Sequence, residues 1–311
     1  STSNRCMIGG MVGNNSSGTT SIQFGVTRDK VVEVKTILSD ASSVTFSSIS
    51  AEEFKQKCKL NTLEGKVYSS IYEQLKDEQV QEEIRSRFPK PEIHRRNTGY
   101  ALDALLDNSV FDNKSEQPFN MCKLLAGSEG TLAFSTEITL QLDVLPPKHG
   151  VMVAAHFESI TSCLEAVVPA MQHKLYACEM MDKVILDCTL NNREQQKNRF
   201  FIEGDPAAIL MLEVRANTLD DARKQALALI ATIENSGLSY AYPTLEGSQI
   251  NQALELRKAG LGLLGNIVGD RKAVACIEDT AVALEDLAPY INEFSALMAD
   301  FKQDAVYYAH A

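Results

Sequence analysis

The first segment with residues suited to chemistry reads "MIGGMVGNNSSGTTSIQFG" (residues 7–25). It combines closely spaced glycines with asparagine, serine and threonine, and it contains few bulky apolar side chains. Such a run presents backbone N–H groups that no large side chain covers, so it suits a phosphate or a pyrophosphate. It is neither a Walker loop, since no Gly-Lys-Ser/Thr closes it, nor the GxGxxG dinucleotide fingerprint. The alternative is an ordinary polar turn.

Two later loops share these features. "RNTGY" (Arg96–Tyr100) and "AGSEGTL" (Ala126–Leu132) are also polar, contain glycine and lie beside strand-like sequence. Three such loops in one half of the chain favour a common binding site over three unrelated turns. Spacing alone leaves open whether the loops converge.

Arg257 is the single residue that the hydrophobic pattern marks most sharply. It lies in the middle of the apolar stripe of a helix expected over Ile250–Leu264. The stripe consists of Ile250, Ala253, Leu254, Leu261 and Leu264. A buried guanidinium without a partner is costly, so Arg257 must meet an anion. Two partners fit: one of the 41 Asp and Glu residues in an internal salt bridge, or the carboxylate of a substrate.

Histidine and cysteine spacing excludes several other chemistries. None of the five histidines stands at HxxxH or HExxH spacing, so the sequence does not predict a complete metal site. No GxSxG elbow supports Ser-His-Asp catalysis. The seven cysteines form no CxxC pair and are odd in number, which favours free thiols in a reducing compartment.

Length and composition indicate a globular protein of roughly two domains. The chain has 311 residues, of which 44% are hydrophobic and 23% are charged. Its net charge of −11 argues against nucleic acid as a partner, because binding phosphates requires a basic face. No apolar run approaches the ~18 residues that a membrane span needs, and no secretory signal is present.

The elements expected in the first half would hold the glycine-bearing loops between strands and helices. Residues 22–46 alternate apolar and polar positions, as expected for two strands joined by a turn. Ser50 and Glu53 form a capping box that begins a short helix. Residues 62–88 form an amphipathic helical region, and Thr131–Leu145 alternates like a strand.

The second half, after a domain boundary at Pro146 and Pro147, alternates strands and helices. This order predicts two-layer α+β packing. Strands are expected at Val151–Phe157, Ala207–Arg215, Ala273–Ile277 and Ala305–Tyr308. Helices are expected at Thr161–Lys174, with a kink at Pro169, and after the cap Thr218. A last helix should turn inward Leu284, Leu287, Ile291, Phe294, Met298 and Phe301.

Three longer stretches together resemble a known family. "STSNRCMIGGMVGNNSSGTTSIQFGVTRDKVVEVKTILSD" is similar to the second FAD-contacting segment of vanillyl-alcohol-oxidase-type flavoproteins. "RRNTGYALDALL" and "LLAGSEGTLAFSTEITLQL" resemble the second hallmark of the FAD-linked oxidase, or D-2-hydroxyacid dehydrogenase, branch. "LELRKAGLGLLGNIVGDRKAVACIEDTAV" resembles the cap segment of large bacterial D-2-hydroxyglutarate dehydrogenase-like members fused to an iron–sulfur domain.

The resemblance implies an α+β architecture with two parts. Residues 1–147 would be the C-terminal part of a PCMH-type FAD-binding domain. Residues 148–311 would be a truncated substrate or cap domain of the FAD-linked oxidase C-terminal type, with an antiparallel sheet and flanking helices. The chain has no initiator Met and ends at "YYAHA", so we expect an internal excerpt of a longer protein.

Site residues follow from the same resemblance. Arg257 matches the cap-domain arginine that grips the substrate carboxylate. His310 matches the first histidine of the family's YGHxGxGxxH motif and would bind a divalent metal, such as zinc, that orients the 2-hydroxy acid. The residues that match FAD-contacting motifs are Thr2, Ser3, Gly9, Gly10, Met11, Asn14, Asn15, Ser17, Gly18, Asn97, Tyr100, Gly127, Ser128, Glu129, Gly130 and Thr131.

Several parts of the family pattern do not occur in the chain. These are the upstream glycine-rich loop, the second metal histidine, and the later Glu-His segment that carries a further metal ligand and the base. No iron–sulfur cysteine run is present, so such a cluster would belong to segments outside this chain. Cys276 or Ile277 stands where D-2-hydroxyglutarate dehydrogenases have a substrate lysine, which leaves the particular acid open.

The implied function is FAD-dependent oxidation of a small D-2-hydroxy acid to the 2-oxo acid by hydride transfer to the flavin. The acid would be of the lactate, glycolate or 2-hydroxyglutarate class, and the electrons would pass to a quinone, an electron-transfer protein or a fused iron–sulfur domain. We expect a cytoplasmic protein, and peripheral membrane attachment and a homodimer are left open. The alternative is a non-catalytic flavin-binding or substrate-sensing scaffold of the same fold.

Overall fold

The computed structural model describes most of the chain as two compact units. The described residues are 6–93, 95–96, 99–190, 192–266, 269–270, 272–274, 276–277 and 280–310, with the backbone alone at Leu261 and Asn266. Unit 1 comprises Ser1–Ser17, Gly25–Asp143 and Asp279–Ala281. Unit 2 comprises Gly18–Phe24, Val144–Glu278 and Val282–Ala311.

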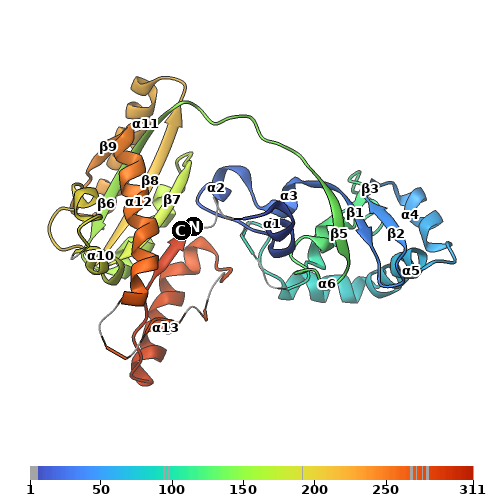
Figure 1. Cartoon of the computed structure of the whole chain (residues 1–311). Coiled ribbons are helices and arrows are strands. Elements are labelled where there is room, and N and C mark those ends of the chain that lie inside the picture. The colour runs from blue at the N-terminus through green and yellow to red at the C-terminus, as the bar shows by residue number, and fades with distance from the viewer. Residues whose placement is uncertain are drawn as a thin grey trace. The chain divides into compact units, whose positions relative to one another are not determined.

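An antiparallel three-stranded sheet in the order β2-β1-β5 organises unit 1 (Figure 1). Its strands are β1 (Val31–Ile37), β2 (Ser43–Phe46) and β5 (Phe134–Leu140). A separate antiparallel pair joins β3 (Ser48–Ile49) to β4 (Phe119–Asn120). The register places Val34 opposite both Phe46 and Ile138, so apolar side chains of three strands meet on one face.

Short helices and an aromatic cluster complete unit 1. The helices are α1 (Ile8–Asn14), α3 (Thr27–Lys30), α4 (Ala51–Cys58), α5 (Leu63–Leu75), α6 (Glu78–Arg87), α7 (Cys122–Leu125) and the 3₁₀ turn η1 (Asp103–Leu105). Phe54, Tyr68 and Phe119 are fully buried. The rings of Phe54 and Phe119 meet edge to face with centroids 4.7 Å apart, so these aromatics fasten α4 and α5 to the β3–β4 pair.

Of the elements predicted for unit 1, the capped helix is confirmed, and the first strand and the helical region over 62–88 have different bounds. The capping box is confirmed, because Ser50 Oγ accepts from Glu53 N at 3.2 Å and the Glu53 carboxylate accepts from Ser50 N at 2.8 Å. The first strand, however, begins at Val31, since Asp29 accepts from Val26 N at 2.9 Å and closes a helical turn before it. The helical region over 62–88 divides where Asp77 caps α6.

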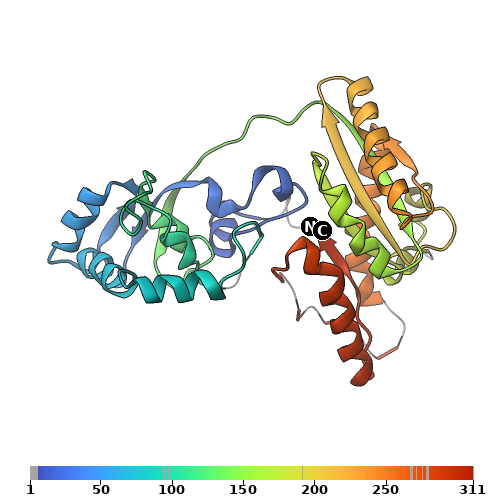
Figure 2. The same cartoon turned by 180° about the vertical axis from the view of Figure 1, so that it is seen from behind.

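A five-stranded antiparallel sheet in the order β10-β7-β8-β6-β9 forms the centre of unit 2, and it confirms the α+β class (Figures 1 and 2). Its strands are β6 (His149–Phe157), β7 (Ala177–Asp182), β8 (Ala208–Ala216), β9 (Thr244–Glu246) and β10 (Tyr308–His310). β6, β7 and β8 are almost wholly buried, as expected for strands covered on both faces.

Helices cover both faces of this sheet. On one face lie α8 (Ile160–Glu165), α9 (Val167–Ala170) and α11 (Leu219–Ser236), and on the other α10 (Lys183–Leu190) and α12 (Ser248–Leu263). The remaining elements are α2 (Ser21–Phe24), α13 (Leu287–Asp300) and the 3₁₀ turns η2 (Gln196–Arg199), η3 (Leu264–Asn266) and η4 (Leu284–Asp286). Thr218 caps α11 as predicted, with its side chain accepting from Asp221 N at 3.2 Å.

Some expectations for unit 2 were wrong. The helix over Thr161–Lys174 is two short helices, since Pro169 has no N–H to continue the ladder. No strand forms among the described residues of Ala273–Ile277, and the last strand begins at Tyr308. Phe301 is 70% exposed, because α13 ends before it and Lys302 turns into the left-handed region. The sequence did not indicate β7, β9 and α10.

Across the described part of the chain, the helices are too short or too polar for any of them to cross a membrane.

Candidate functional site

The end of α1 and the loop after α7 lie against each other in unit 1. Gly127 N donates to Val12 O and Glu129 N donates to Gly13 O, each at 2.9 Å. α1 itself ends at Asn15, whose φ of 53° reverses the chain. The structure therefore brings together two of the glycine-bearing loops, which spacing alone could not show.

Arg28 connects the two loops through hydrogen bonds, and the sequence did not predict this role. Its Nε donates to Lys123 O at 2.9 Å and its Nη2 to Ala126 O at 2.8 Å, while its backbone N donates to Asn15 Oδ1 at 2.7 Å. Burial lowers the pKa of the Arg28 guanidinium, and the charge of Asp103 opposes that shift. No apolar periodicity surrounds Arg28 in "VTRDKVVEV", so the sequence carried no signal of its burial.

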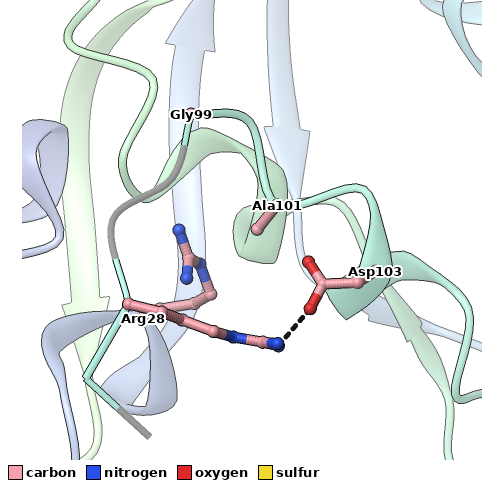
Figure 3. A pocket seen from close by; sticks show the side chains of 5 residues that line it. Arg28, Gly99, Ala101 and Asp103 are labelled. Atoms are coloured by element: carbon pink, nitrogen blue, oxygen red, sulfur yellow. Dashed lines mark ion pairs between the residues drawn. The ribbon is translucent and has the colours of Figure 1, made fainter. Parts of the chain in front are cut away.

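The third loop reaches the same place. Tyr100 Oη and Thr131 Oγ1 form a hydrogen bond of 2.7 Å, and Thr131 Oγ1 donates to Ser128 O at 2.5 Å. Arg96 forms an ion pair with Asp103, the contact that is dashed in Figure 3. The small pocket in Figure 3 is lined by Arg28, Arg96, Gly99, Ala101 and Asp103. All three loops thus converge around Arg28.

Two glycines of α1 present bare backbone. Neither Gly9 nor Gly10 has a heavy atom within 4 Å of where a Cβ would stand, and neither has a positive φ. In contrast, a Cβ on Gly65 would lie 2.1 Å from Leu60 O, and one on Gly260 would lie 2.4 Å from Ile185 Cγ2. Packing explains the latter glycines but not Gly9 and Gly10. Their backbone is therefore open to the close approach of a ligand.

The other predicted cofactor residues fall in several places. Met11 Sδ accepts from Cys6 Sγ at 3.5 Å, Asn14 Nδ2 donates to Ser16 Oγ at 3.1 Å, and Ser17 Oγ accepts from Arg95 Nε at 3.3 Å. Gly18 belongs to unit 2, where its N donates to Ser21 Oγ at 2.8 Å. Gly130 has a φ of 72° and an open Cβ direction. Thr2, Ser3 and Asn97 lie outside the described residues.

Arg257 lies in a buried cluster of unit 2, on the sheet face that α10 and α12 cover. It is 4% exposed and forms an ion pair with Glu179, which is fully buried. Its Nη1 donates to Tyr308 Oη at 2.5 Å, its Nη2 donates to Ala309 O at 2.9 Å, and its guanidinium lies 3.9 Å from the centroid of the Tyr308 ring. The internal salt bridge, one of the two partners considered, is therefore present.

One nitrogen of this guanidinium is left without a hydrogen-bond partner among the described residues. This nitrogen is Nε, and it is buried. A buried donor without an acceptor is costly, so a polar ligand that reaches it would gain a strong, charge-assisted hydrogen bond. The salt bridge to Glu179 and a ligand contact at Nε use different nitrogens of the guanidinium, so they are compatible.

His310 belongs to the same cluster. The antiparallel register of β7 and β10 places it directly opposite Glu179, and His310 Nδ1 lies 2.6 Å from Glu179 Oε1. Sequence reasoning had singled out Arg257 and His310 but not the carboxylate between them. Glu179 is a charged residue inside the buried run "ACEMMD", so the argument that marked Arg257 would also have marked it.

The described residues contain no group of three His, Cys, Asp or Glu side chains that could hold a metal ion. His310 and Glu179 are a pair, and their direct contact occupies the space between them. The described part of the chain therefore does not fit a complete metal site.

Comparisons with known proteins identify a family for the chain. Residues 146–311 match the family described as FAD linked oxidases, C-terminal domain. The chain is 30% identical over 306 residues to a D-2-hydroxyglutarate dehydrogenase of Pseudomonas putida, covering 96% of this chain and 29% of that protein. It is 30% identical over 308 residues to the D-2-hydroxyglutarate dehydrogenase of Escherichia coli K12, with the same coverage. It thus spans about 29% of the length of these curated relatives.

A solved structure of alkyldihydroxyacetonephosphate synthase aligns with 94% of this chain and 45% of its own, at 10% identity and a TM-score of 0.48. The family match covers more than half of the chain and contains both Arg257 and His310. The chain therefore belongs to the family of FAD-linked oxidases and carries their C-terminal domain.

Proposed function

We propose that the chain supplies the flavin-contacting loops and the substrate cluster of an FAD-dependent dehydrogenase that oxidises a D-2-hydroxy acid to the 2-oxo acid. The observation that carries the proposal is the bare glycine backbone of α1, which no contact within the described part of the protein explains. The named function of the relatives, aligned with 96% of the chain, supplies the substrate class.

The cofactor-facing residues have separate tasks in this proposal. Gly9 and Gly10 give a ring system access to the backbone. Arg28 fixes the loops by binding two carbonyl groups from beneath, so the surface exists before the cofactor arrives. A bound FAD would supply the hydride-accepting chemistry that oxidation of the hydroxy acid needs.

The substrate-facing residue is Arg257. Its Nε would donate a hydrogen bond to a carboxylate oxygen of the hydroxy acid. The ion pair between Glu179 and Nη2 would hold the guanidinium in place. The relatives are named for 2-hydroxyglutarate. We propose the wider class of D-2-hydroxy acids for this chain, because Cys276 or Ile277 stands where the family resemblance leads us to expect a substrate lysine.

Further roles are supported by the family resemblance alone. His310 would be a metal ligand only together with groups beyond the described residues. An iron–sulfur cluster would likewise need segments outside this chain. A quinone, an electron-transfer protein or a fused iron–sulfur domain would accept the electrons. A cytoplasmic location, peripheral membrane attachment and a homodimer are proposals of the same kind.

Two measurements test the proposed function. The purified chain, incubated with FAD and then desalted, should retain flavin absorbance, and the Gly9→Val variant should not. The full-length protein should reduce a dye with at least one member of a panel of D-2-hydroxy acids, and with none of the L-enantiomers at a comparable rate. Flavin binding without any turnover would instead support the non-catalytic scaffold.

A further inference from the structure

Glu179 is a buried carboxylate to which the family resemblance gives no role, and the proposed function uses only its ion pair with Arg257. It lies on β7, which pairs with β10, and its side chain is on the sheet face that α12 covers. Both β10 and α12 carry predicted functional residues. Its side chain is completely buried, so water does not compete for its oxygens. Each oxygen has a distinct partner: Oε1 lies 2.6 Å from His310 Nδ1, and Oε2 forms the ion pair with Arg257.

The contact between Glu179 and His310 is set by backbone register, and the contact with Arg257 is made from the helix that covers the same face. Antiparallel pairing places His310 opposite Glu179, Ala309 opposite Met180 and Tyr308 opposite Met181. Directly opposite residues of an antiparallel pair project to the same face. That face is the one covered by α12, so Arg257 reaches down onto Glu179 from the helix.

The contact to His310 selects one tautomer of its imidazole. The carboxylate of an ion pair accepts hydrogen bonds and has none to donate. In its neutral form, His310 therefore carries its proton on Nδ1, and the lone pair is on Nε2. In this tautomer Nε2 can accept a proton or bind an electrophile, whereas in the other it cannot.

The contact to Arg257 fixes the orientation of the guanidinium plane. Glu179 and Ala309 O hold Nη2, and Tyr308 lies under the plane and binds Nη1. Nε is the guanidinium nitrogen that has no hydrogen-bond partner among the described residues, so it is available to a ligand. Glu179 thus contacts both side chains. It selects the nitrogen of His310 that carries the proton, and it fixes the orientation of the Arg257 guanidinium.

We propose that Glu179 is the positioning residue that locks the His310 tautomer and the Arg257 orientation. The part of this inference that concerns turnover rests on the proposed function, whereas the part that concerns the tautomer does not. A carboxylate that orients a histidine in this way typically affects activity by roughly 10–100-fold when it is replaced.

The decisive variant is Glu179→Gln, because its amide should reverse the tautomer. Arg257 offers only donors, so the amide oxygen of Gln should turn toward Arg257 and the amide NH₂ toward His310. Nδ1 of His310 would then have to accept, and its proton would move to Nε2. Nitrogen-15 NMR of histidine-labelled protein distinguishes the two tautomers, and the His310→Asn variant assigns the signal among the five histidines.

The expected result is an Nδ1–H tautomer in the unmodified chain and an Nε2–H tautomer in Glu179→Gln. An Nε2–H tautomer in the unmodified chain, or the same tautomer in both proteins, would overturn the proposal. The measurement on the unmodified chain stands even where the variant does not fold.

Asp182→Asn is the matched control. Asp182 is also a buried carboxylate of β7, and it accepts from Tyr307 N at 2.7 Å and from Ile185 N at 3.0 Å, so neither of these contacts involves His310 or Arg257. This variant should leave the His310 tautomer unchanged, and a change would mean that any disturbance of β10 has the same effect.

Turnover separates this inference from the proposed function. In the full-length protein, Glu179→Gln should lower kcat for the D-2-hydroxy acid on the order of 10–100-fold while flavin content stays the same. Absence of all turnover in the unmodified protein would refute the proposed function and leave the tautomer result valid. Normal kcat in Glu179→Gln, with the tautomer reversed, would refute the positioning role.

Discussion

A Cβ on Gly127 would lie 2.8 Å from Nη2 of Arg28, the guanidinium nitrogen that donates to Ala126 O. Gly127 also has a φ of 89°, which favours glycine. The loop therefore passes over the arginine so closely that the two residues depend on each other. This contact is the point at which the opening segment, the loop after α7 and Arg28 are joined.

Gly127→Ala should therefore destabilise unit 1 through both backbone strain and displacement of Arg28. We expect a loss of about 1–3 kcal/mol in the free energy of unfolding, measured by urea denaturation. Gly130→Ala is the matched control, since Gly130 has a φ of 72° but no atom within 4 Å of the added Cβ. An equal loss in both variants would show that the contact with Arg28 contributes nothing.

Substitution of Gly9 or Gly10 should separate stability from cofactor binding. Both glycines lie in α1 with open space around the added Cβ, so each change to Ala should stabilise the chain by roughly 0.5–1 kcal/mol through helix propensity. The same variants should lose flavin affinity if the cofactor lies on this backbone. Thermal unfolding and flavin retention after desalting measure the two effects.

Gly262→Ala provides the control for that experiment. Gly262 is also a helical glycine with nothing within 4 Å, and it lies in α12 of unit 2. It should gain stability without loss of flavin. Unchanged flavin affinity in both Gly9→Ala and Gly10→Ala would remove α1 from the cofactor site.

Local sequence signals predicted the elements whose ends carry explicit caps. Ser50 with Glu53, and Thr218 before α11, both cap helices as expected, because capping depends on residues within one turn. In α11 itself, Ala222, Ala226 and Ile233 repeat with helical spacing and are all buried, so its apolar stripe is visible in the sequence. Such signals are local, so they can be recognised without knowledge of the fold.

The elements and residues that were missed depend on long-range pairing. β7 is buried because β8 and β10 flank it, and nothing within "ACEMMD" distinguishes a central strand from a helix. Arg28 is buried because carbonyl groups 95 and 98 residues away along the chain accept from it. The partner of Arg257 could be predicted only as some anion, because its identity follows from the packing of α12 on the sheet face that contains Glu179.

Removal of Arg257 alone should be much more damaging than removal of the whole ion pair. Arg257→Met leaves the fully buried Glu179 carboxylate without its cation, and such broken pairs cost about 3–5 kcal/mol. The double variant Glu179→Gln/Arg257→Met should recover a large part of that loss, because no buried charge is left unpaired. Urea denaturation of both single variants and the double variant gives the coupling energy. Strictly additive losses in the free energy of unfolding would show that Glu179 and Arg257 have no coupling energy.

The same Arg257→Met variant tests substrate binding when it is folded. Flavin content should stay unchanged, while KM for the D-2-hydroxy acid should rise by roughly tenfold or more, because a charge-assisted hydrogen bond is lost. The measurement is dye reduction by the full-length protein across substrate concentrations. A lower kcat with an unchanged KM would instead assign Arg257 to the reacting geometry and not to binding of the carboxylate.

His156 should make the stability of unit 2 depend on pH. It is fully buried, its Nδ1 lies 2.8 Å from Ala154 O, and its Nε2 accepts from Glu203 N at 3.1 Å, so both ring nitrogens are engaged in the neutral form. Burial lowers the pKa of His156 below 6.5, with the nearby Glu203 carboxylate opposing the shift. Below about pH 6.5, His156 therefore binds a proton more readily in the unfolded chain than in the folded chain. The free energy of unfolding then falls as pH falls.

His156→Gln isolates this effect, because it removes the titrating group and leaves the others in place. Asp182 and Glu213 have raised pKa values through burial, so their protonation acts in the opposite direction as pH falls. The difference in unfolding free energy between the unmodified chain and the variant should therefore shrink from about pH 7.5 to about pH 5.5, as only the unmodified chain loses the histidine contribution. Urea denaturation at several pH values measures that difference. A difference that is constant over this range would mean that His156 binds its proton equally well in the folded and unfolded states.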